Sequence, residues 1–377
     1  MALLQAKKST APRILVAGGP ETGAARWLTG FGAPDPFGVA MTSADEVHLF
    51  VSHLEAARAA KAAKPGVQLH VIDGTLSAAL VEWARSRQLR KVVAGTALPL
   101  GVARAFEEAS IAVSLLSPQD EPLPGRLVKT EEELRYIRLA QHAAAAAVAR
   151  ARVILREATV SSPSGQLRWQ GRTLTSERLR EEMENVIRSR GCASDDGLIA
   201  AGGRQAACPH EAGHGPLRAG TAIILDVFPR HQASGYWGDL TRTLMKGRPR
   251  NPRILAMYRA VLATQRRVFE ALRPGVTGAA MHQLALDSLA AAGFPLDTTP
   301  GHERGMFHGL GHGVGLDIHE EPRLSLRGPV LAEGNVITVE PGVYDPAVGG
   351  IRIEDTVVVR PDGPQFLAPC SRALFIP

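Results

Sequence analysis

Four acidic side chains stand within or at the ends of strand-like apolar segments in the C-terminal part of this 377-residue chain. An ionised carboxylate in such surroundings is costly unless it is paired, hydrogen-bonded or bound to a cation. Four converging carboxylates would also repel one another and raise one another's pKa values. The fold must therefore bring these groups to a centre where their charge is compensated. The four residues are Asp226, Asp239, Glu340 and Glu354.

The four carboxylates form two pairs with similar spacing. Asp226 lies in Ile-Ile-Leu-Asp-Val-Phe, and Asp239 follows 13 residues later. Glu340 lies in Val-Ile-Thr-Val-Glu-Pro-Gly, and Glu354 follows 14 residues later. Each spacing fits two adjacent strands joined by a loop, so we expect the members of each pair to lie near each other.

Two divalent cations would balance the four negative charges, and one imidazole would complete the ligand set. Eight of the twelve histidines lie between residues 210 and 319. His308, His312 and His319 lie on or just after a Gly-rich segment, where glycine lets backbone and imidazole approach a crowded centre. Mainly oxygen ligands with one histidine favour harder ions such as Mn²⁺ over a thiolate-type zinc site.

Each feature also has an ordinary structural explanation when taken alone. An Asp in an apolar strand is most often at a strand end, Glu340-Pro-Gly can be a simple turn, and the histidines can be loop or core residues. The segment Gly309–Gly315 is not a phosphate loop, because no Gly-Lys-Ser/Thr follows it. A soft-metal cluster over Cys208–His214 lacks a second cysteine. The occurrence of all these features in one stretch favours a metal centre.

A proline-rich segment divides the chain. Ser117–Gly125 contains three prolines, so we predict a linker at about 117–126. Residues 1–120 alternate strands and helices, which predicts an α/β domain, and residues 126–377 predict an α+β domain. The predicted strands are 14–18, 47–51, 68–72, 91–94, 112–116, 222–228, 238–245, 336–340 and 350–359. The predicted helices are 53–63, 76–87, 100–109, 130–157, 176–190, 252–272 and 277–292. Thr130 and Glu133 predict a capping box at the start of 130–157.

Composition excludes several other classes of protein. The net charge of +6 is mild and spread along the chain, so we expect no nucleic-acid partner. No apolar run approaches the ~18 residues of a membrane span, so we expect no membrane association. Three widely spaced cysteines argue against a disulfide framework and favour a reducing, cytoplasmic setting.

The site residues together resemble metallopeptidase family M24, which includes methionine aminopeptidase, Xaa-Pro aminopeptidase and Xaa-Pro dipeptidase (prolidase). The likeness covers about 126–377. A weaker likeness, at Trp27-Leu-Thr-Gly30 and Leu49-Phe-Val51, is to the creatinase-type N-terminal domain of the proline-specific branch. The resemblance implies a pita-bread catalytic domain behind an RNase-H-like α/β domain. The motifs are Asp226, Asp239-Leu-Thr-Arg-Thr, His308-Gly-Leu-Gly-His312, His319-Glu-Glu-Pro, Val-Glu340-Pro-Gly and Ile-Arg352-Ile-Glu354-Asp.

The resemblance also implies a role for each site residue. His210 and His308 correspond to active-site histidines, and His319 to the histidine on the substrate side. Arg352 corresponds to a residue just outside the ligands, and Glu340 to a ligand that can also carry a proton to the leaving nitrogen. The ligands of two divalent cations, Mn²⁺ before Co²⁺ or Zn²⁺, are then Asp226, Asp239, His312, Glu340 and Glu354.

The chain departs from the family at one place. The spacing between Asp226 and Asp239 is two residues longer than usual, and Pro229–Gln232 is unlike the small-residue turn common in the family. An added pair preserves the alternation of side chains in a hairpin, so we expect a longer turn and a retained ligand.

Several functional alternatives remain open from the sequence. The N-terminal domain favours the proline-specific branch over methionine aminopeptidase, and the compact chain favours a dipeptidase over an Xaa-Pro aminopeptidase that acts on longer peptides. A catalytically inactive peptide-binding protein, or creatinase-like hydrolysis without metal, is disfavoured because all five expected metal ligands are present. The resemblance also implies a homodimer and a proline-containing di- or oligopeptide substrate. Candidates for binding a substrate carboxylate are Arg230, Arg304 and Arg352.

Overall fold

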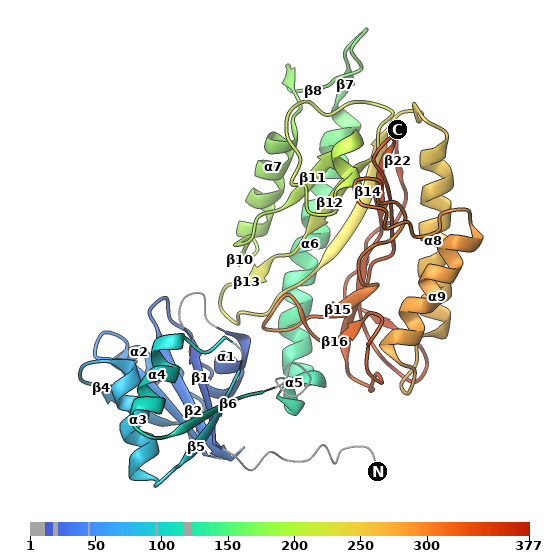
Figure 1. Ribbon diagram of the computed structural model, residues 1–377. Coiled ribbons are helices and arrows are strands. Elements are labelled where there is room, and N and C mark those ends of the chain that lie inside the picture. The colour runs from blue at the N-terminus through green and yellow to red at the C-terminus, as the bar shows by residue number, and fades with distance from the viewer. Residues whose placement is uncertain (1–11, 18–21, 44–45, 96, 117–122) are drawn as a thin grey trace. The chain divides into compact units, whose positions relative to one another are not determined.

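The chain divides into two compact units, Met1–Arg126 and Leu127–Pro377, each with its own buried core (Figure 1). The computed structural model describes residues 12–17, 22–43, 46–95, 97–116 and 123–377. Residues 117–122 of the predicted linker lie outside the described residues. The last residues of the predicted linker begin the short helix α5 (Pro124–Leu127). Proline is compatible with the first turn of a helix, because its missing N–H has no intrahelical partner there.

The first unit contains a six-stranded mixed sheet with strand order β4-β3-β2-β1-β5-β6. The α/β prediction for this unit is confirmed, although strand β2 and helix α1 were missed. Helix α1 has only seven residues, with its N-terminus capped by the Thr22 side chain and its C-terminus followed by left-handed Gly30 (φ 76°). The strands are β1 (Arg13–Ala17), β2 (Phe37–Ser43), β3 (Glu46–Ser52), β4 (Gln68–Ile72), β5 (Lys91–Ala94) and β6 (Ala112–Leu115); the helices are α1 (Gly23–Thr29), α2 (Ala56–Ala62), α3 (Leu76–Ser86) and α4 (Leu100–Glu108). The last residue of the predicted strand 14–18 lies outside the described residues.

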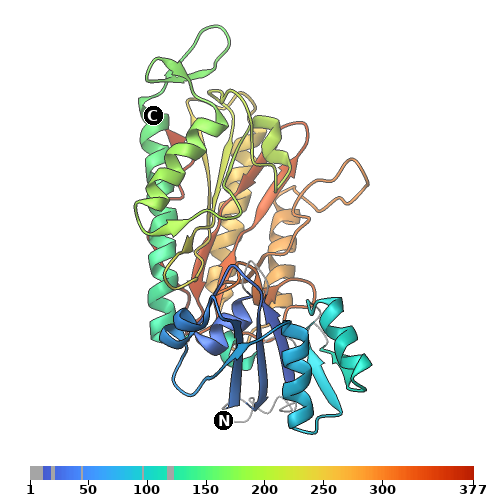
Figure 2. The ribbon, with the colours of Figure 1, turned by 90° about the vertical axis from the view of Figure 1, so that its left-hand side faces the viewer.

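Helix α6 (Glu131–Glu157) runs along the length of the second unit, drawn in teal to green in Figure 2. The predicted capping box at its start is present. The Thr130 N–H donates to Glu133 Oε2 at 2.8 Å, and the Glu133 N–H donates to Thr130 Oγ1 at 3.2 Å. The other predicted helices of this unit form within two residues of their expected ends: α7 (Ser176–Arg188), α8 (Arg253–Ala271) and α9 (Gly278–Ala291).

Two sheets lie between these helices, with α6 and α7 on one side and α8 and α9 on the other (Figure 1). One core joins α6 and α7 to the first sheet, and a second core joins α8 and α9 to the second sheet. The first sheet is β11 (Ile199–Gly202), β12 (Ile223–Val227), β14 (Leu240–Lys246) and β22 (Phe375–Ile376); the second is β16 (Glu320–Leu324), β15 (Gly311–Gly313), β17 (Val336–Val339), β20 (Asp355–Val358) and β21 (Gln365–Phe366).

The predicted strand 350–359 is in fact two strands in different sheets. Strand β19 (Gly349–Arg352) pairs with β18 (Gly342–Asp345), whereas β20 pairs with β17. The strand is interrupted because the Glu354 N–H donates to the Thr241 carbonyl of β14 at 3.0 Å, across the gap between the two sheets. A continuous apolar pattern could not reveal this change of partner.

The extra residues between Asp226 and Asp239 form a hairpin tip anchored on α6. Strand β13 (Arg230–His231) pairs with β10 (Cys192–Ala193). The ring of Tyr136 stacks on His231 and Tyr236, with centroid distances of 6.3 and 5.8 Å. The Tyr236 hydroxyl also donates to Glu133 Oε1 at 2.7 Å. The remaining small elements are β7 (Thr159–Val160), β8 (Leu167–Trp169), β9 (Arg172–Thr173) and the 3₁₀ helix Gly203–Ala207.

Candidate active site

Strand register places the members of each carboxylate pair side by side. Strands β12 and β14 are antiparallel, and Asp226 pairs with Thr241. Asp239 stands two residues before Thr241, so its side chain lies on the same face as that of Asp226. The 13-residue spacing of Asp226 and Asp239 predicted two adjacent strands, and β12 and β14 are adjacent.

The second pair follows from the register of β17 and β20. Val339 pairs with Asp355 in these antiparallel strands, so Glu340 and Glu354 occupy opposing positions just beyond the ladder. The two sheets thus bring two carboxylates each to the same centre.

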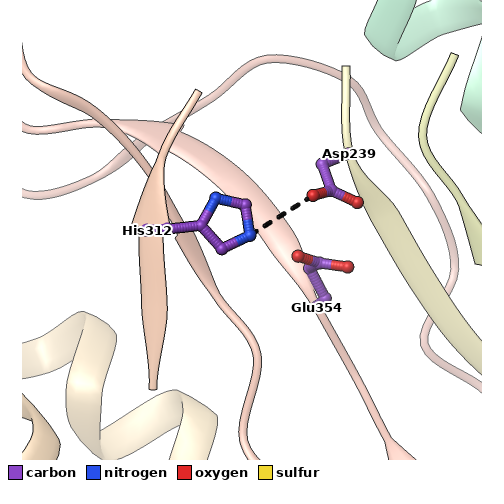
Figure 3. Close-up of side chains that lie close together, drawn as sticks. All are labelled: Asp239, His312 and Glu354. Carbon is purple, nitrogen blue, oxygen red and sulfur yellow. Dashed lines mark ion pairs between the residues drawn. The ribbon is translucent and has the colours of Figure 1, made fainter. Parts of the chain in front are cut away.

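His312, on β15, completes a buried group with Asp239 and Glu354 (Figure 3). One ligand atom from each of the three lies within 4.8 Å of the others. The three residues are only 6%, 5% and 2% exposed, respectively. His312 Nε2 lies 3.5 Å from Asp239 Oδ2 and 3.5 Å from Glu340 Oε1. One strand and the ends of three others therefore present nitrogen and oxygen donors to one small volume.

The ring of His312 is held as a neutral donor of an electron pair. Its Nδ1 lies 3.1 Å from the Gly313 carbonyl, which can only accept, so the proton is on Nδ1. Burial, followed by the charge of His319, lowers the His312 pKa to about 3. The Nε2 lone pair therefore points toward Asp239 and Glu340, as it would if the three side chains shared a cation.

Asp226 supplies a second indication that the centre binds a cation. Its Oδ2 accepts from Arg352 Nη2 at 2.6 Å. Its Oδ1 is buried and has no hydrogen-bond partner among the described residues. A buried carboxylate oxygen is costly to leave unpaired, and a divalent cation would satisfy it. The residues present therefore fit a metal site.

Burial dominates the electrostatics of the other carboxylates. It raises the pKa values of Asp239 and Glu354 well above their usual range, and neighbouring carboxylates raise them further. Burial likewise raises the pKa of Glu340 to about 8, although the Arg352 charge opposes the shift. Without cations, the centre therefore retains protons at neutral pH.

A chain of hydrogen bonds supports Asp226 from behind. Arg352, which is 3% exposed, donates to Asp226 and, through Nη1, to the Tyr344 hydroxyl at 2.8 Å. The Tyr344 oxygen lies 2.9 Å from His308 Nε2 and, having accepted from Arg352, donates its own proton to that nitrogen. His308 Nδ1 is 2.7 Å from the Gly309 carbonyl. Both ring nitrogens of His308 are thus occupied by protein groups.

The comparison with known families settles the class of this chain. The sequence model of metallopeptidase family M24 matches residues 135–361, more than half of the chain. The chain belongs to metallopeptidase family M24. Membership implies the use of divalent metal, in agreement with the buried Asp239–His312–Glu354 group.

Curated relatives of this M24 chain are similar over most of their length. An Xaa-Pro dipeptidase of Pyrococcus furiosus is 30% identical over 341 residues, covering 89% of this chain and 88% of the relative. An uncharacterised peptidase of Bacillus subtilis, YqhT, is 28% identical over 355 residues, covering 93% and 92%.

Solved structures confirm the predicted fold class. The prolidase from Pyrococcus furiosus superposes with a TM-score of 0.78 at 26% identity, covering 97% of this chain and 98% of that one. An X-Pro aminopeptidase from Thermotoga maritima superposes with a TM-score of 0.77 at 22% identity, covering 97% of each chain, which shows the fold alone. The M24 chain therefore has a pita-bread fold with an N-terminal domain, and the fold does not distinguish the two activities.

The structure brings the remaining predicted histidines to the rim of the site. His319 is exposed, and its ring packs edge-on against His312 with a centroid distance of 4.3 Å. Burial, followed by the charge of Arg323, lowers the His319 pKa. His210 is also exposed, and the preceding Pro209 carbonyl lies 3.4 Å from both terminal nitrogens of Arg352.

Sequence reasoning missed two threonines of the site. The Thr241 hydroxyl donates to Glu354 Oε2 at 2.8 Å, and the Thr338 hydroxyl lies 3.4 Å from Glu340 Oε1. Each stands two residues from a carboxylate on its own strand segment. The period-two alternation of a strand was therefore a signal that could have identified both.

The most informative omission is Arg323, on β16 four residues after His319. Its positive charge lowers the pKa values of Glu340, His312 and His319. The guanidinium has no hydrogen bond or ion pair within the part of the chain that the structure describes. In contrast, Arg230 is paired with Asp195 at 2.7 Å. Arg352, as described above, is paired with Asp226.

We expect Glu340→Gln to stabilise the metal-free protein at pH 8 but not at pH 4.5. A carboxyl group whose pKa rises from 4.5 to about 8 on folding contributes stability that is fully present below 4.5 and lost as pH rises through 8. Glutamine has no proton to lose, so the variant should gain several degrees in melting temperature over wild type between these pH values. Calorimetry in EDTA measures the difference.

The control is Glu108→Gln, which replaces an exposed carboxylate of α4. Its melting temperature should follow that of wild type at both pH values. A Glu340→Gln difference that does not change with pH would contradict the raised pKa.

Proposed function

We propose that this M24 chain is an Xaa-Pro dipeptidase, a hydrolase that cleaves the bond before proline in dipeptides. The observation that carries the proposal is the buried centre of four carboxylates and His312, with an unsatisfied oxygen on Asp226. The similarity to the Xaa-Pro dipeptidase of Pyrococcus furiosus over most of both chains supports it.

Two divalent cations are proposed at this centre, with Mn²⁺ favoured over Co²⁺ or Zn²⁺ because the donors are mainly oxygen. Bound cations would polarise the scissile carbonyl and lower the pKa of a water molecule. The residues that would hold them are Asp226, Asp239, His312, Glu340 and Glu354.

We propose that His319 stabilises the scissile carbonyl oxygen. Its ring stands outside the buried His312, at the exposed side of the centre. Its lowered pKa keeps it neutral at pH 7, so one ring nitrogen carries a proton that can be donated to an oxygen gaining negative charge.

Glu340 is the group proposed to move a proton to the leaving nitrogen. The nitrogen of an Xaa-Pro bond is a tertiary amide and must gain a proton as it departs. Glu340 Oε1 lies at the centre, 3.5 Å from His312 Nε2, so its carboxylate is close to the groups that would act on the scissile bond. The ring nitrogens of His308 hydrogen-bond to the Tyr344 hydroxyl and the Gly309 carbonyl. We propose that His308 positions Tyr344 and, through it, Arg352.

Arg323 is proposed as the group that binds the proline carboxylate. Its positive charge lowers the pKa values of His312, His319 and Glu340. Of the earlier candidates, Arg230 and Arg352 are already paired with Asp195 and Asp226, and Arg304 lies in the exposed turn 297–304. A carboxylate anchor close to the centre favours a dipeptide, whose terminal carboxylate immediately follows the scissile bond.

The proposal is tested by comparing Ala-Pro with Ala-Pro-Ala after EDTA treatment and addition of Mn²⁺, Co²⁺ or Zn²⁺. We expect Ala-Pro hydrolysis to require added metal, and Arg323→Met to raise its KM by about 10–100-fold, because a charge-assisted hydrogen bond is lost. Arg327→Met, at an exposed neighbouring arginine, is the matched control. Preference for Ala-Pro-Ala would indicate an aminopeptidase, and absence of hydrolysis with metal bound would indicate a peptide-binding protein.

His312→Ala and His319→Ala should separate metal binding from catalysis. His312→Ala should lower metal occupancy, because an imidazole ligand is removed. His319→Ala should retain metal and lower kcat by about 10²–10³-fold, because one donor to the developing oxyanion is lost. Metal stoichiometry and kcat are measured on both variants. Loss of metal from His319→Ala alone would require the two roles to be exchanged.

The same proposal extends to the domains of the chain, its oligomeric state and its location. We propose that residues 1–120 and 126–377 are a creatinase-like domain and the catalytic domain, and that the chain forms a homodimer in the cytoplasm. No described helix is long and apolar enough to cross a membrane.

A further inference from the structure

A glutamine buried behind the site connects the two strand ends that carry Glu340 and Glu354. Gln265, on α8, is 0% exposed. Its Nε2 lies 3.0 Å from the Val339 carbonyl and 3.1 Å from the Ile353 carbonyl. Val339 directly precedes Glu340, and Ile353 directly precedes Glu354. One amide group therefore holds the backbone on both sides of the gap between these carboxylates.

The chemistry of the surroundings fixes the orientation of this amide. The third neighbour of Nε2 is Asp355 Oδ2, at 3.1 Å. Two carbonyls and a carboxylate paired with two arginines can only accept, so the NH₂ group must face them. The opposite rotamer would place oxygen against three oxygens.

The opposite end of the same amide has an unfavourable environment. Gln265 Oε1 is buried without a hydrogen-bond partner among the described residues. A methionine of similar size would fill the space without this orphan acceptor. Packing alone therefore does not account for glutamine at this position, whereas its contact with the two ligand-bearing strand ends does.

A second buried glutamine makes a comparable contact with another carboxylate. Gln141, on α6, is 1% exposed. Its Oε1 accepts from the Asp239 N–H and its Nε2 donates to the Asp239 carbonyl, both at 2.8 Å. The neighbouring Gly238 permits this approach, because a Cβ there would lie 2.5 Å from the backbone nitrogen of Gln141.

We infer that Gln265 is a positioning residue that sets the separation of Glu340 and Glu354 and thereby the affinity and geometry of the metal centre. The inference rests on the proposed function, since it assumes that these carboxylates bind divalent cations. Gln265 acts through the backbone, so its loss changes where the carboxylates stand without removing a ligand.

The test compares full-length wild type with Gln265→Met, using Mn²⁺ alone in titration calorimetry and the visible absorption spectrum of the Co²⁺-loaded protein. Groups that orient metal ligands typically contribute 10–100-fold to metal affinity. We expect the Mn²⁺ dissociation constant to rise by about that factor, and the Co²⁺ bands, which report ligand geometry, to shift.

The matched control is Thr264→Val. Thr264 is the neighbouring residue on α8, is 0% exposed, and bonds through Oγ1 to Ser288 Oγ on α9 at 3.0 Å. The variant loses a buried hydrogen bond that does not reach the centre. We expect its metal-free melting temperature to fall while its Mn²⁺ affinity and Co²⁺ spectrum remain those of wild type.

Gln265→Glu keeps the shape of the side chain and, when protonated, one of its two donor hydrogens, so it tests the inference if Gln265→Met does not fold. We expect weaker Mn²⁺ binding and a shifted Co²⁺ spectrum. A wild-type affinity and spectrum in either Gln265 variant, or an equal loss in Thr264→Val, would overturn the positioning role. Absence of Mn²⁺ binding by wild type would overturn the metal centre itself and this inference with it.

Discussion

Electrostatic repulsion among four buried carboxylates is the constraint on which the structure of this M24 chain depends. The two sheets meet so that Asp226 and Asp239 face Glu340 and Glu354, and burial raises the pKa values of the last three. The fold offsets the repulsion only in part, through Arg352 at Asp226 and threonine hydroxyls at the two glutamates. The centre is therefore complete only with added positive charge, which is why a metal-dependent hydrolase is the function that fits it.

Buried hydrogen bonds and an ion pair hold the four carboxylates in place despite their repulsion. Arg242 is fully buried, pairs with Asp355 at 2.6 Å and also donates to the Glu354 carbonyl. Gln141 and Gln265 hold the backbone at Asp239 and at the two glutamates from opposite helices. The long helices thus contribute directly to the site, because each presents one buried amide to a strand end.

The sequence was informative where chemistry and local pattern coincide. The carboxylate spacings predicted the pairing of β12 with β14 and of β17 with β20, and the Thr130–Glu133 box predicted the start of α6. The sequence was uninformative where tertiary contacts determine the strand ends or the neighbours of a side chain. The break at Glu354 depends on a hydrogen bond to Thr241 in another sheet. Arg323 and Gln265 lie in ordinary strand and helix patterns, and only the packed structure shows what they face.

The most direct test of the account is the anomalous difference map of crystals grown with Mn²⁺. The account predicts two peaks per chain between the five side chains, with Asp226 Oδ1 ligating a cation and His312 doing so through Nε2. No peak at the centre, or Mn²⁺ bound elsewhere while Asp226 Oδ1 remains without a partner, would contradict it.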